Sequence, residues 1–145
     1  MMNEEITIDK LIKKDRNFKM SEEKRVAEKR NSTDKKIVDI FLSIGISAHL
    51  QGYQYLKEAI KLVIKNPELI NCITKKLYPA VAEIFETTPC RVERGIRHAL
   101  EVAYDKGKIV QLNKIYGIEI FTKEEKPTNS EFIAILADKL SLELK

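Results

Sequence analysis

From Asp34 onward, apolar residues recur at intervals of three and four residues, and glycine and proline interrupt the pattern. This spacing places apolar side chains along one face of a helix, so it predicts a succession of amphipathic helices around a shared core. Gly45 is placed to end the first helix, and the second should stop near Asn66 because Pro67 disfavours helical geometry in the residue before it. The apolar positions of these two helices are Ile37, Ile40, Phe41 and Ile44, followed by Leu56, Ile60, Val63 and Ile64.

The helical pattern continues to the C-terminus in four further segments. A third element covers about 67–85, and Pro79 should kink it or divide it in two because proline lacks a backbone N–H. A fourth helix is predicted over 89–106, and "KIVQLNKIYG" is a short fifth. The sixth, "TNSEFIAILADKLSLEL", opens with Thr128 and Glu131 in the spacing of a capping box.

The fold class predicted from this pattern is all-α. Between the fifth and sixth segments, "IEIFTKEEKP" alternates in polarity and predicts one strand at most. A chain of 145 residues is long enough for one domain with a sizeable core but not for two full domains. We therefore expect about six helices in a single domain, residues 34–145.

A charged N-terminal arm is predicted over residues 1–33. Residues 1–36 hold 11 Lys and Arg and 8 Asp and Glu, which is most of the chain's net charge of +4. The segment "SEEKRVAEKR" suits a solvated helix, since its acids lie near the start and its bases near the end, but we expect a mobile arm or linker rather than a packed element. Its role is either to touch nucleic acid or, as we prefer, to act as a solubilising tether.

The sequence lacks the features of membrane and secreted proteins. No apolar run approaches the roughly 20 residues that span a bilayer. The first ten residues, "MMNEEITIDK", are acidic and have none of the cationic and apolar regions of a secretory signal. We therefore expect a cytoplasmic protein with no membrane partner.

The sequence also lacks the motifs of an enzyme or a metal site. It has no glycine-rich phosphate loop, nucleophile elbow or paired-carboxylate motif, so we expect no catalytic residues and no cofactor. The two cysteines and two histidines are separated by wide, unmatched gaps, unlike the paired spacing of zinc ligands, and we interpret the cysteines as reduced structural thiols. These four residues are His49, Cys72, Cys90 and His98.

The stretch "TTPCRVERGIRHALEVAYDKG" concentrates cations near the start of the fourth helix. Thr88 is suited to the N-cap, Pro89 to the first helical position and Gly107 to the position just past the end. At about 100° per residue, the side facing the core carries Val92, Ile96, Ala99 and Ala103. The outward side carries Cys90, Arg91, Arg94, Arg97 and His98, with Glu93 at its flank. Cations near a helix N-terminus are unfavourable by about 0.3–1 kcal/mol each, so a purely structural helix would place acids there.

Two interpretations of this cationic face follow. Glu93 with Arg97, and Arg97 with Glu101, can form ion pairs on an ordinary solvated face. The preceding residues favour a functional role, because "PAVAEIFETTPCRVERGI" predicts a short helix with the small Ala82, a turn over 86–88 and then the arginine helix. This is the outline of a helix-turn-helix, whose second helix enters the DNA major groove, where arginine can bind guanine through two hydrogen bonds. Glycine is common at the turn position that Glu86 occupies here.

Three separated blocks carry a resemblance to a known family. They are "GISAHLQGYQYLKEAI", "TKKLYPAVAEIFETTPCRVERGIRHALEVAYDKG" and "KPTNSEFIAILADKLSLE". In this order they resemble the DNA-binding effector domain of sporulation stage zero protein A, the response regulator of endospore-forming bacteria. The resemblance implies a six-helix domain that binds a short asymmetric box in double-stranded DNA as tandem, head-to-tail copies and regulates transcription.

The resemblance also implies roles for individual residues. Arg91, Glu93 and Arg94 would read bases, and Arg97, His98 and Thr88 would hold the DNA phosphates. The region "IVQLNKIYGIEIF" matches the part implicated in contact with the RNA polymerase sigma factor. Its candidate contacts are Leu112, Ile115 and Tyr116, although we prefer to interpret these apolar residues as core.

The chain departs from the family pattern in two ways. The family has a phosphoacceptor receiver domain before the effector domain, and 36 polar residues cannot fold into one, so we expect DNA binding that is independent of phosphorylation. Gly95 lies inside the recognition helix at a cost of about 1 kcal/mol relative to alanine, which indicates a less rigid helix or one pressed against DNA or another helix. The alternative to a DNA-binding regulator is a protein-interaction module that antagonises a full-length regulator or the polymerase without reading DNA.

Overall fold

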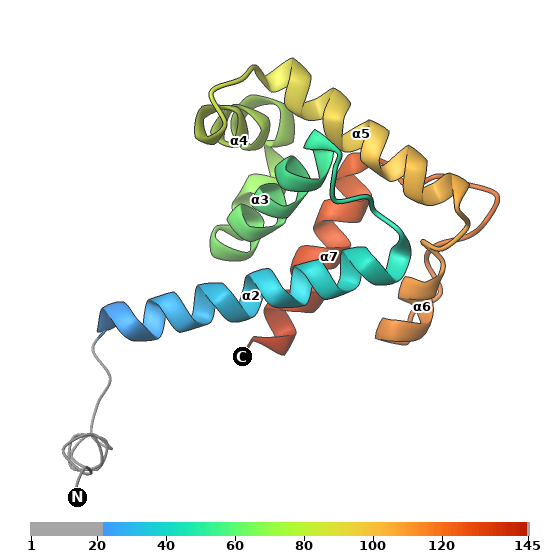
Figure 1. Cartoon of the computed structure of the whole chain (residues 1–145), viewed down its shortest axis with the longest axis horizontal. Coiled ribbons are helices and arrows are strands. Elements are labelled where there is room, and N and C mark those ends of the chain that lie inside the picture. The colour runs from blue at the N-terminus through green and yellow to red at the C-terminus, as the bar shows by residue number, and fades with distance from the viewer. Residues whose placement is uncertain (1–21, 145) are drawn as a thin grey trace, which may run out of the picture. The chain divides into compact units, whose positions relative to one another are not determined.

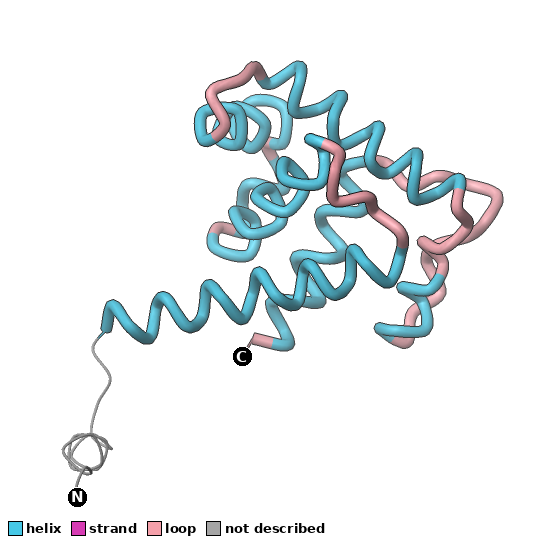
Figure 2. Tube along the Cα trace, in the orientation of Figure 1, coloured by secondary structure: helices cyan, strands magenta, loops and turns pink. Residues whose placement is uncertain are grey.

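The computed structural model describes residues 22–144, in which all regular structure is helical (Figures 1 and 2). The residues from Thr33 onward form a compact unit of their own, and the packing described below is that of this unit. The α-helices are α2 (Glu22–Ile44), α3 (Gln51–Lys65), α4 (Tyr78–Ile84), α5 (Pro89–Asp105), α6 (Gln111–Tyr116) and α7 (Asn129–Glu143). A 3-10 segment η1 (Pro67–Asn71) and a π-helical segment η2 (Ile73–Leu77) lie between α3 and α4. The predicted all-α class with six helices is confirmed.

The predicted helix ends agree closely with the structure. Gly45 follows the last residue of α2 with φ of 81°, a left-handed conformation that favours glycine. Helix α3 ends at Lys65, one residue before Asn66. At the start of α7, the Thr128 side chain accepts from the Glu131 N–H at 3.1 Å, and the Glu131 carboxylate accepts from the Thr128 N–H at 2.9 Å. This is the capping box that the sequence predicts.

The structure describes only part of the N-terminal arm predicted over residues 1–33. Residues 1–21 lie outside the described part of the chain, while α2 begins at Glu22 and continues without a break to Ile44. The segment "SEEKRVAEKR" is therefore helical from Glu22 onward. The role of the arm stays a prediction.

The predicted third element is divided at Cys72 and not at its internal proline. Cys72, with φ of −138° and ψ of 50°, separates η1 from η2, and η2 continues directly into α4. Pro79 is the second residue of α4 and follows η2 without a break. The break at Cys72 has no signal in the sequence, because no glycine or proline accompanies it.

The segment "IEIFTKEEKP" contains no strand and is held instead by a side chain. Asn113 Oδ1 accepts from the N–H groups of Ile120 and Phe121 at 3.1 and 3.0 Å, and Asn113 Nδ2 donates to the Phe121 carbonyl at 2.7 Å. These backbone groups are satisfied by one amide of α6, so the segment needs no strand partner.

Helix α3 lies at the centre of the packing and contacts α4, α5 and α7. Every helix from α2 to α7 contributes to one hydrophobic core. Its largest fully buried side chains include Phe41, Leu56, Ile60, Leu77, Ile96, Leu100, Leu112, Phe132, Ile133 and Leu136. The buried side of α5 thus packs against this core from Val92 to Ala103.

Helices α3 and α5 approach each other closely where they cross, and each helix has a glycine at this point. A Cβ atom added to Gly52 would lie 1.9 Å from the Gly95 carbonyl oxygen, and one added to Gly95 would lie 2.9 Å from Cδ2 of Tyr55. Neither helix has room for a side chain at this point. Of the three explanations for Gly95 that the sequence leaves open, the structure supports contact with another helix.

Candidate nucleic-acid interface

Helices α4 and α5 are joined by a tight turn. The Thr87 N–H donates to the Ala82 carbonyl at 2.9 Å and the Glu86 N–H to the Glu83 carbonyl at 3.3 Å, the two bonds of a Schellman motif. Glu86 occupies the left-handed position with φ of 53°. The backbone therefore adopts the conformation usual for glycine at this point, at a cost of about 1–2 kcal/mol for a residue with a Cβ. The order of short helix, turn and longer helix is that of a helix-turn-helix.

Helix α5 begins at the predicted residue, and its apolar side faces the core as predicted. The Thr88 side chain accepts from the Arg91 N–H at 3.2 Å and so caps the helix, and Pro89 is the first helical residue. Its buried side carries Val92, Ile96, Ala99, Leu100 and Ala103. Thr88 can still donate its hydroxyl proton, because the cap uses the oxygen only as an acceptor.

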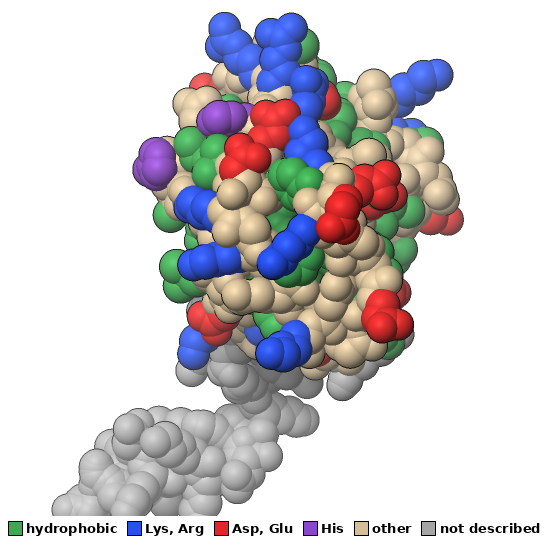
Figure 3. All heavy atoms as spheres, turned by 90° about the vertical axis from the view of Figure 1, so that its right-hand side faces the viewer, with side chains coloured by type: hydrophobic (Ala, Val, Ile, Leu, Met, Phe, Trp, Pro, Cys, Tyr) green, Lys and Arg blue, Asp and Glu red, His purple; other side chains and the backbone are tan. Residues whose placement is uncertain are grey.

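Three of the predicted DNA-contacting side chains are exposed and unpaired. Arg91, Arg94 and His98 point to solvent, and within the described part of the chain their side chains form no hydrogen bond or ion pair. Figure 3 shows Lys and Arg side chains gathered at the top of the view, with histidine on the same face. The N-terminal half of α5 therefore presents positive charge that no acid within the described chain neutralises.

Two further predicted contacts, Glu93 and Arg97, are joined to each other. Nε of Arg97 donates to the Glu93 carboxylate at 3.1 Å, and Nη2 forms a second bond to its other oxygen. This is the ion pair expected for a solvated face, and it links a residue predicted to read bases with one predicted to hold phosphate. Neither side chain can move to DNA without affecting the other.

The second half of the outward face is acidic. Glu101 and Asp105 lie there, and Lys126, from the loop before α7, donates to Glu101 at 2.7 Å. This hydrogen bond and the nearby positive charge of Lys126 lower the pKa of the Glu101 carboxyl. Glu101 therefore pairs with Lys126 rather than with Arg97, and the unpaired arginines of α5 lie in its first half.

Sequence reasoning missed the contacts that fix α7 beside α5. Asn129 is 9% exposed, and its Nδ2 donates to the Tyr78 hydroxyl oxygen at 3.1 Å and to the Glu93 carbonyl at 3.2 Å. One amide thus ties the start of α7 to α4 and α5. The predicted capping box locates the start of α7, but its partners across the fold have no signal in the sequence.

The three candidate sigma-factor contacts have different environments. Leu112 is fully buried, Ile115 is 47% exposed and Tyr116 is half-buried. The preferred interpretation as core applies to Leu112, which has no surface to offer a partner. Ile115 is the residue of this group that a partner could reach.

Tyr116 leads to a prediction about pH. Burial, with the negative charge of Glu143 as a smaller cause, raises the pKa of Tyr116 to about 12, and its buried hydroxyl has no hydrogen-bond partner among residues 22–144. The ordinary pKa of tyrosine is 10.0, so Tyr116 in the unfolded chain loses its proton at a lower pH than in the folded chain. Its ionisation therefore leaves the free energy of unfolding unchanged below about pH 10 and lowers it as the pH rises towards 12. Tyr116→Phe should leave stability at neutral pH unchanged, since no hydrogen bond is lost.

The measurement is an alkaline titration of tyrosinate absorbance on the wild type and on Tyr116→Phe. The variant lacks Tyr116, so the difference between the two titration curves should be one ionisation centred near pH 12. A missing ionisation near pH 10, or a variant that melts earlier at neutral pH, would contradict the burial argument.

The described residues show no disulfide, no metal site and no membrane-spanning helix. Cys72 is half-buried and Cys90 is exposed, and both are free, so Cys90 does not have the buried position of a structural thiol. Across residues 22–144, no group of three or more His, Cys, Asp or Glu side chains is placed to hold a metal ion. No helix in the same part of the chain is both long and apolar enough to cross a membrane.

Comparison with protein families decides the identity of the domain. The family model described as "Sporulation initiation factor Spo0A C terminal" matches residues 37–140. The chain belongs to this family. The match begins where the periodic apolar pattern begins and ends in α7, so it covers the core, helices α4 and α5 with the turn between them, and the exposed arginines. The family is one of DNA-binding transcription factor domains active in sporulation, and it is not a family of enzymes.

Proposed function

We propose that the chain is a sequence-specific regulator of transcription that binds double-stranded DNA through α5. The observation that supports this most strongly is the exposed, unpaired pair Arg91 and Arg94 at the start of a helix whose other face is fixed in the core. A helix-turn-helix presents the N-terminal residues of its second helix to base edges in the major groove. Arginine there binds the O6 and N7 atoms of guanine.

The proposed division of roles follows the family resemblance. Arg91, Glu93 and Arg94 would contact bases, while Arg97, His98 and Thr88 would contact phosphates and so set the position of the helix. The Glu93 carboxylate, held by Arg97, can accept from a cytosine N4 amino group.

The assembly on DNA is also a proposal. Two copies would bind neighbouring boxes head to tail, because one helix-turn-helix buries limited surface and a second copy raises affinity by linking two binding events. Ile115 would be the residue most accessible to the RNA polymerase sigma factor. We place this activity in the cytoplasm.

We further propose that these 145 residues bind DNA without phosphorylation. Phosphorylation can shift binding only through a domain that has two states and couples to the DNA-binding surface. Residues 1–36, which precede the family match, are too few to fold as a receiver domain. Binding by this chain should therefore depend on its concentration.

The test is a titration of the purified chain onto short duplexes at physiological salt. Duplexes with one copy of the family's box, two copies and a scrambled sequence are compared, with and without a small phosphodonor. We expect tighter binding to the box than to the scrambled duplex, cooperative filling of two boxes and no effect of the donor. Equal binding to box and scrambled duplexes would favour the protein-interaction module, and a requirement for the donor would contradict phosphorylation-independent binding.

A further inference from the structure

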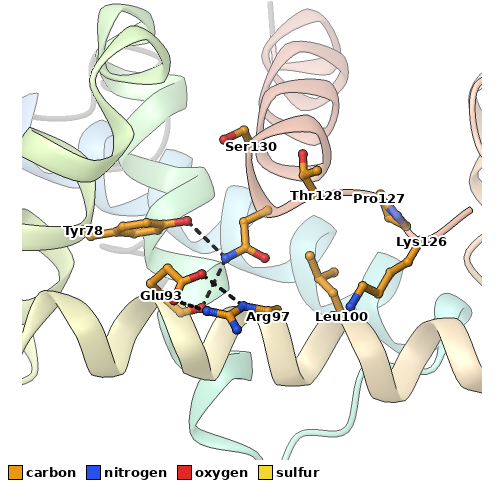
Figure 4. Close-up of a pocket in the computed structure, with 9 residues that line it drawn as sticks. Tyr78, Glu93, Arg97, Leu100, Lys126, Pro127, Thr128 and Ser130 are labelled. Carbon is orange, nitrogen blue, oxygen red and sulfur yellow. Dashed lines mark hydrogen bonds and ion pairs between the residues drawn. The ribbon is translucent and has the colours of Figure 1, made fainter.

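A cavity of about 340 Å³ lies beside α5, between this helix and the start of α7. Figure 4 shows the side chains around it coming from α4, α5 and the loop before α7, with Thr128 and Ser130 at the start of α7. The residues used in the argument below are Tyr78, Glu93, Arg97, Lys126, Asn129 and Ser130, all of which line it. Glu93 and Arg97 already have a proposed contact with DNA, whereas Tyr78, Lys126, Asn129 and Ser130 have none.

The unused hydrogen-bonding capacity of this cavity consists mainly of donors. Tyr78 is 5% exposed and accepts from Asn129, but within residues 22–144 its own hydroxyl proton has no acceptor. Burial raises the pKa of Tyr78, so the hydroxyl keeps this proton at neutral pH. At the entrance, Arg97 uses Nε and Nη2 on Glu93 and keeps Nη1 free, while Lys126 has donated once to Glu101.

The start of α7 adds more donors. Thr128 caps the helix through the Glu131 N–H, which leaves the N–H groups of Asn129 and Ser130 without an acceptor in the described chain. The Ser130 hydroxyl is also exposed there. Glu93 is the one acid among the lining residues, and Arg97 neutralises it. A ligand with several acceptor oxygens and a negative charge fits this arrangement, and a phosphate group has both.

The position of the cavity indicates where such a phosphate comes from. An α-helix with its side chains is about 10–12 Å across and the major groove is about 12 Å wide, so a helix in the groove fills it and its flanks meet the two phosphate backbones. The cavity lies on the flank of α5, next to Arg97, one turn after Arg94.

We propose that this cavity receives a backbone phosphate of the DNA that α5 reads, and that the first turn of α7, through Ser130, is a second DNA-contacting element. The proposal rests on the proposed DNA binding and extends it to a part of the chain that the base-reading residues do not include. The contact is to the backbone, so it acts on every sequence alike.

Ser130→Glu tests the proposal because it separates stability from binding. An acid in the first turn of a helix interacts favourably with the helix dipole, so the variant should melt at or above the wild-type temperature. A carboxylate at the entrance of the cavity should repel a phosphate. We expect about ten-fold weaker binding to box and scrambled duplexes alike, with a slope of log K against log salt that is shallower by about 0.9.

The matched control is Gln111→Glu, which places the same charge at the exposed first residue of α6, away from the cavity lining. It should change affinity by less than about two-fold, as expected for a distant screened charge. A second arm measures melting of wild type and Ser130→Glu in inorganic phosphate without DNA.

The possible results distinguish failure of the phosphate contact from failure of the proposed DNA binding. If Ser130→Glu binds DNA as Gln111→Glu does, the phosphate contact is overturned while the proposed function stands. If the wild type binds no duplex, the proposed function fails and this inference fails with it. If inorganic phosphate stabilises the wild type but not Ser130→Glu, and both bind DNA equally, the site is for a free anion and the DNA contact is overturned.

Discussion

Gly52→Ala is expected to lower the free energy of unfolding by about 3 kcal/mol, at the upper end of the usual cost of overpacking. The added Cβ would lie 1.9 Å from the backbone oxygen of Gly95, and no rotation of a side chain can relieve a clash with backbone. Helices α3 and α5 would have to separate, and the buried contacts along their crossing would loosen. The measurement is a urea denaturation curve for the variant and the wild type.

Two variants serve as controls for Gly52→Ala. Gln54→Ala makes the exposed face of α3 more helix-prone and should change stability by less than about 0.5 kcal/mol. Gly95→Ala should cost less than Gly52→Ala, because its Cβ meets the ring of Tyr55 and alanine recovers about 1 kcal/mol of helix propensity. An unchanged midpoint for Gly52→Ala would show that the two helices do not cross at these glycines.

Arg94→Ala is expected to weaken binding to the preferred duplex by about 5- to 150-fold, equivalent to about 1–3 kcal/mol. Arg94 is exposed and its side chain has no partner among the described residues, so its loss should leave the melting temperature unchanged. Binding to a scrambled duplex should fall much less, because the lost contact is to a base. Lys114→Ala removes an exposed cation from α6 and should have little effect on either duplex.

Arg97→Ala provides the contrasting result. It should weaken binding to all sequences alike and make the salt dependence shallower by about one unit. Because Arg97 also holds Glu93, its removal leaves a carboxylate near the DNA, so the double variant Glu93→Ala/Arg97→Ala should recover part of the loss. Identical behaviour of Arg94→Ala and Arg97→Ala would contradict the proposed division between base and phosphate contacts.

Much of the candidate site could be predicted because its determinants are local. The N-cap at Thr88, the proline after it and the positions of the apolar residues act within a turn or two of helix, so they place Arg91 and Arg94 on the outer face of α5. The same holds for the Thr128 and Glu131 capping box and for Gly45 at the end of α2. The turn at Glu86 also follows from its neighbours, although the residue there is not the glycine that the conformation favours.

Contacts between distant segments could not be predicted in this way. The sequence shows that Gly95 is unusual in a helix, but only the packing shows that it faces Gly52. The sequence permits Arg97 to pair with Glu93 or Glu101, and Lys126 decides the choice by occupying Glu101 from a loop far along the chain.

By itself, then, the sequence determined the all-helical class, the helix ends at Gly45, Thr88 and Thr128, and the outward face of α5, because helical periodicity and capping are short-range interactions. Only the tertiary structure decided which acids neutralise which cations, how close α3 and α5 approach, and that Tyr78, Asn129 and Ser130 meet beside α5. Those features depend on atoms brought together from α3, α4, α5, α7 and the loop before α7, and the distance between such atoms is set by the packing of the whole core.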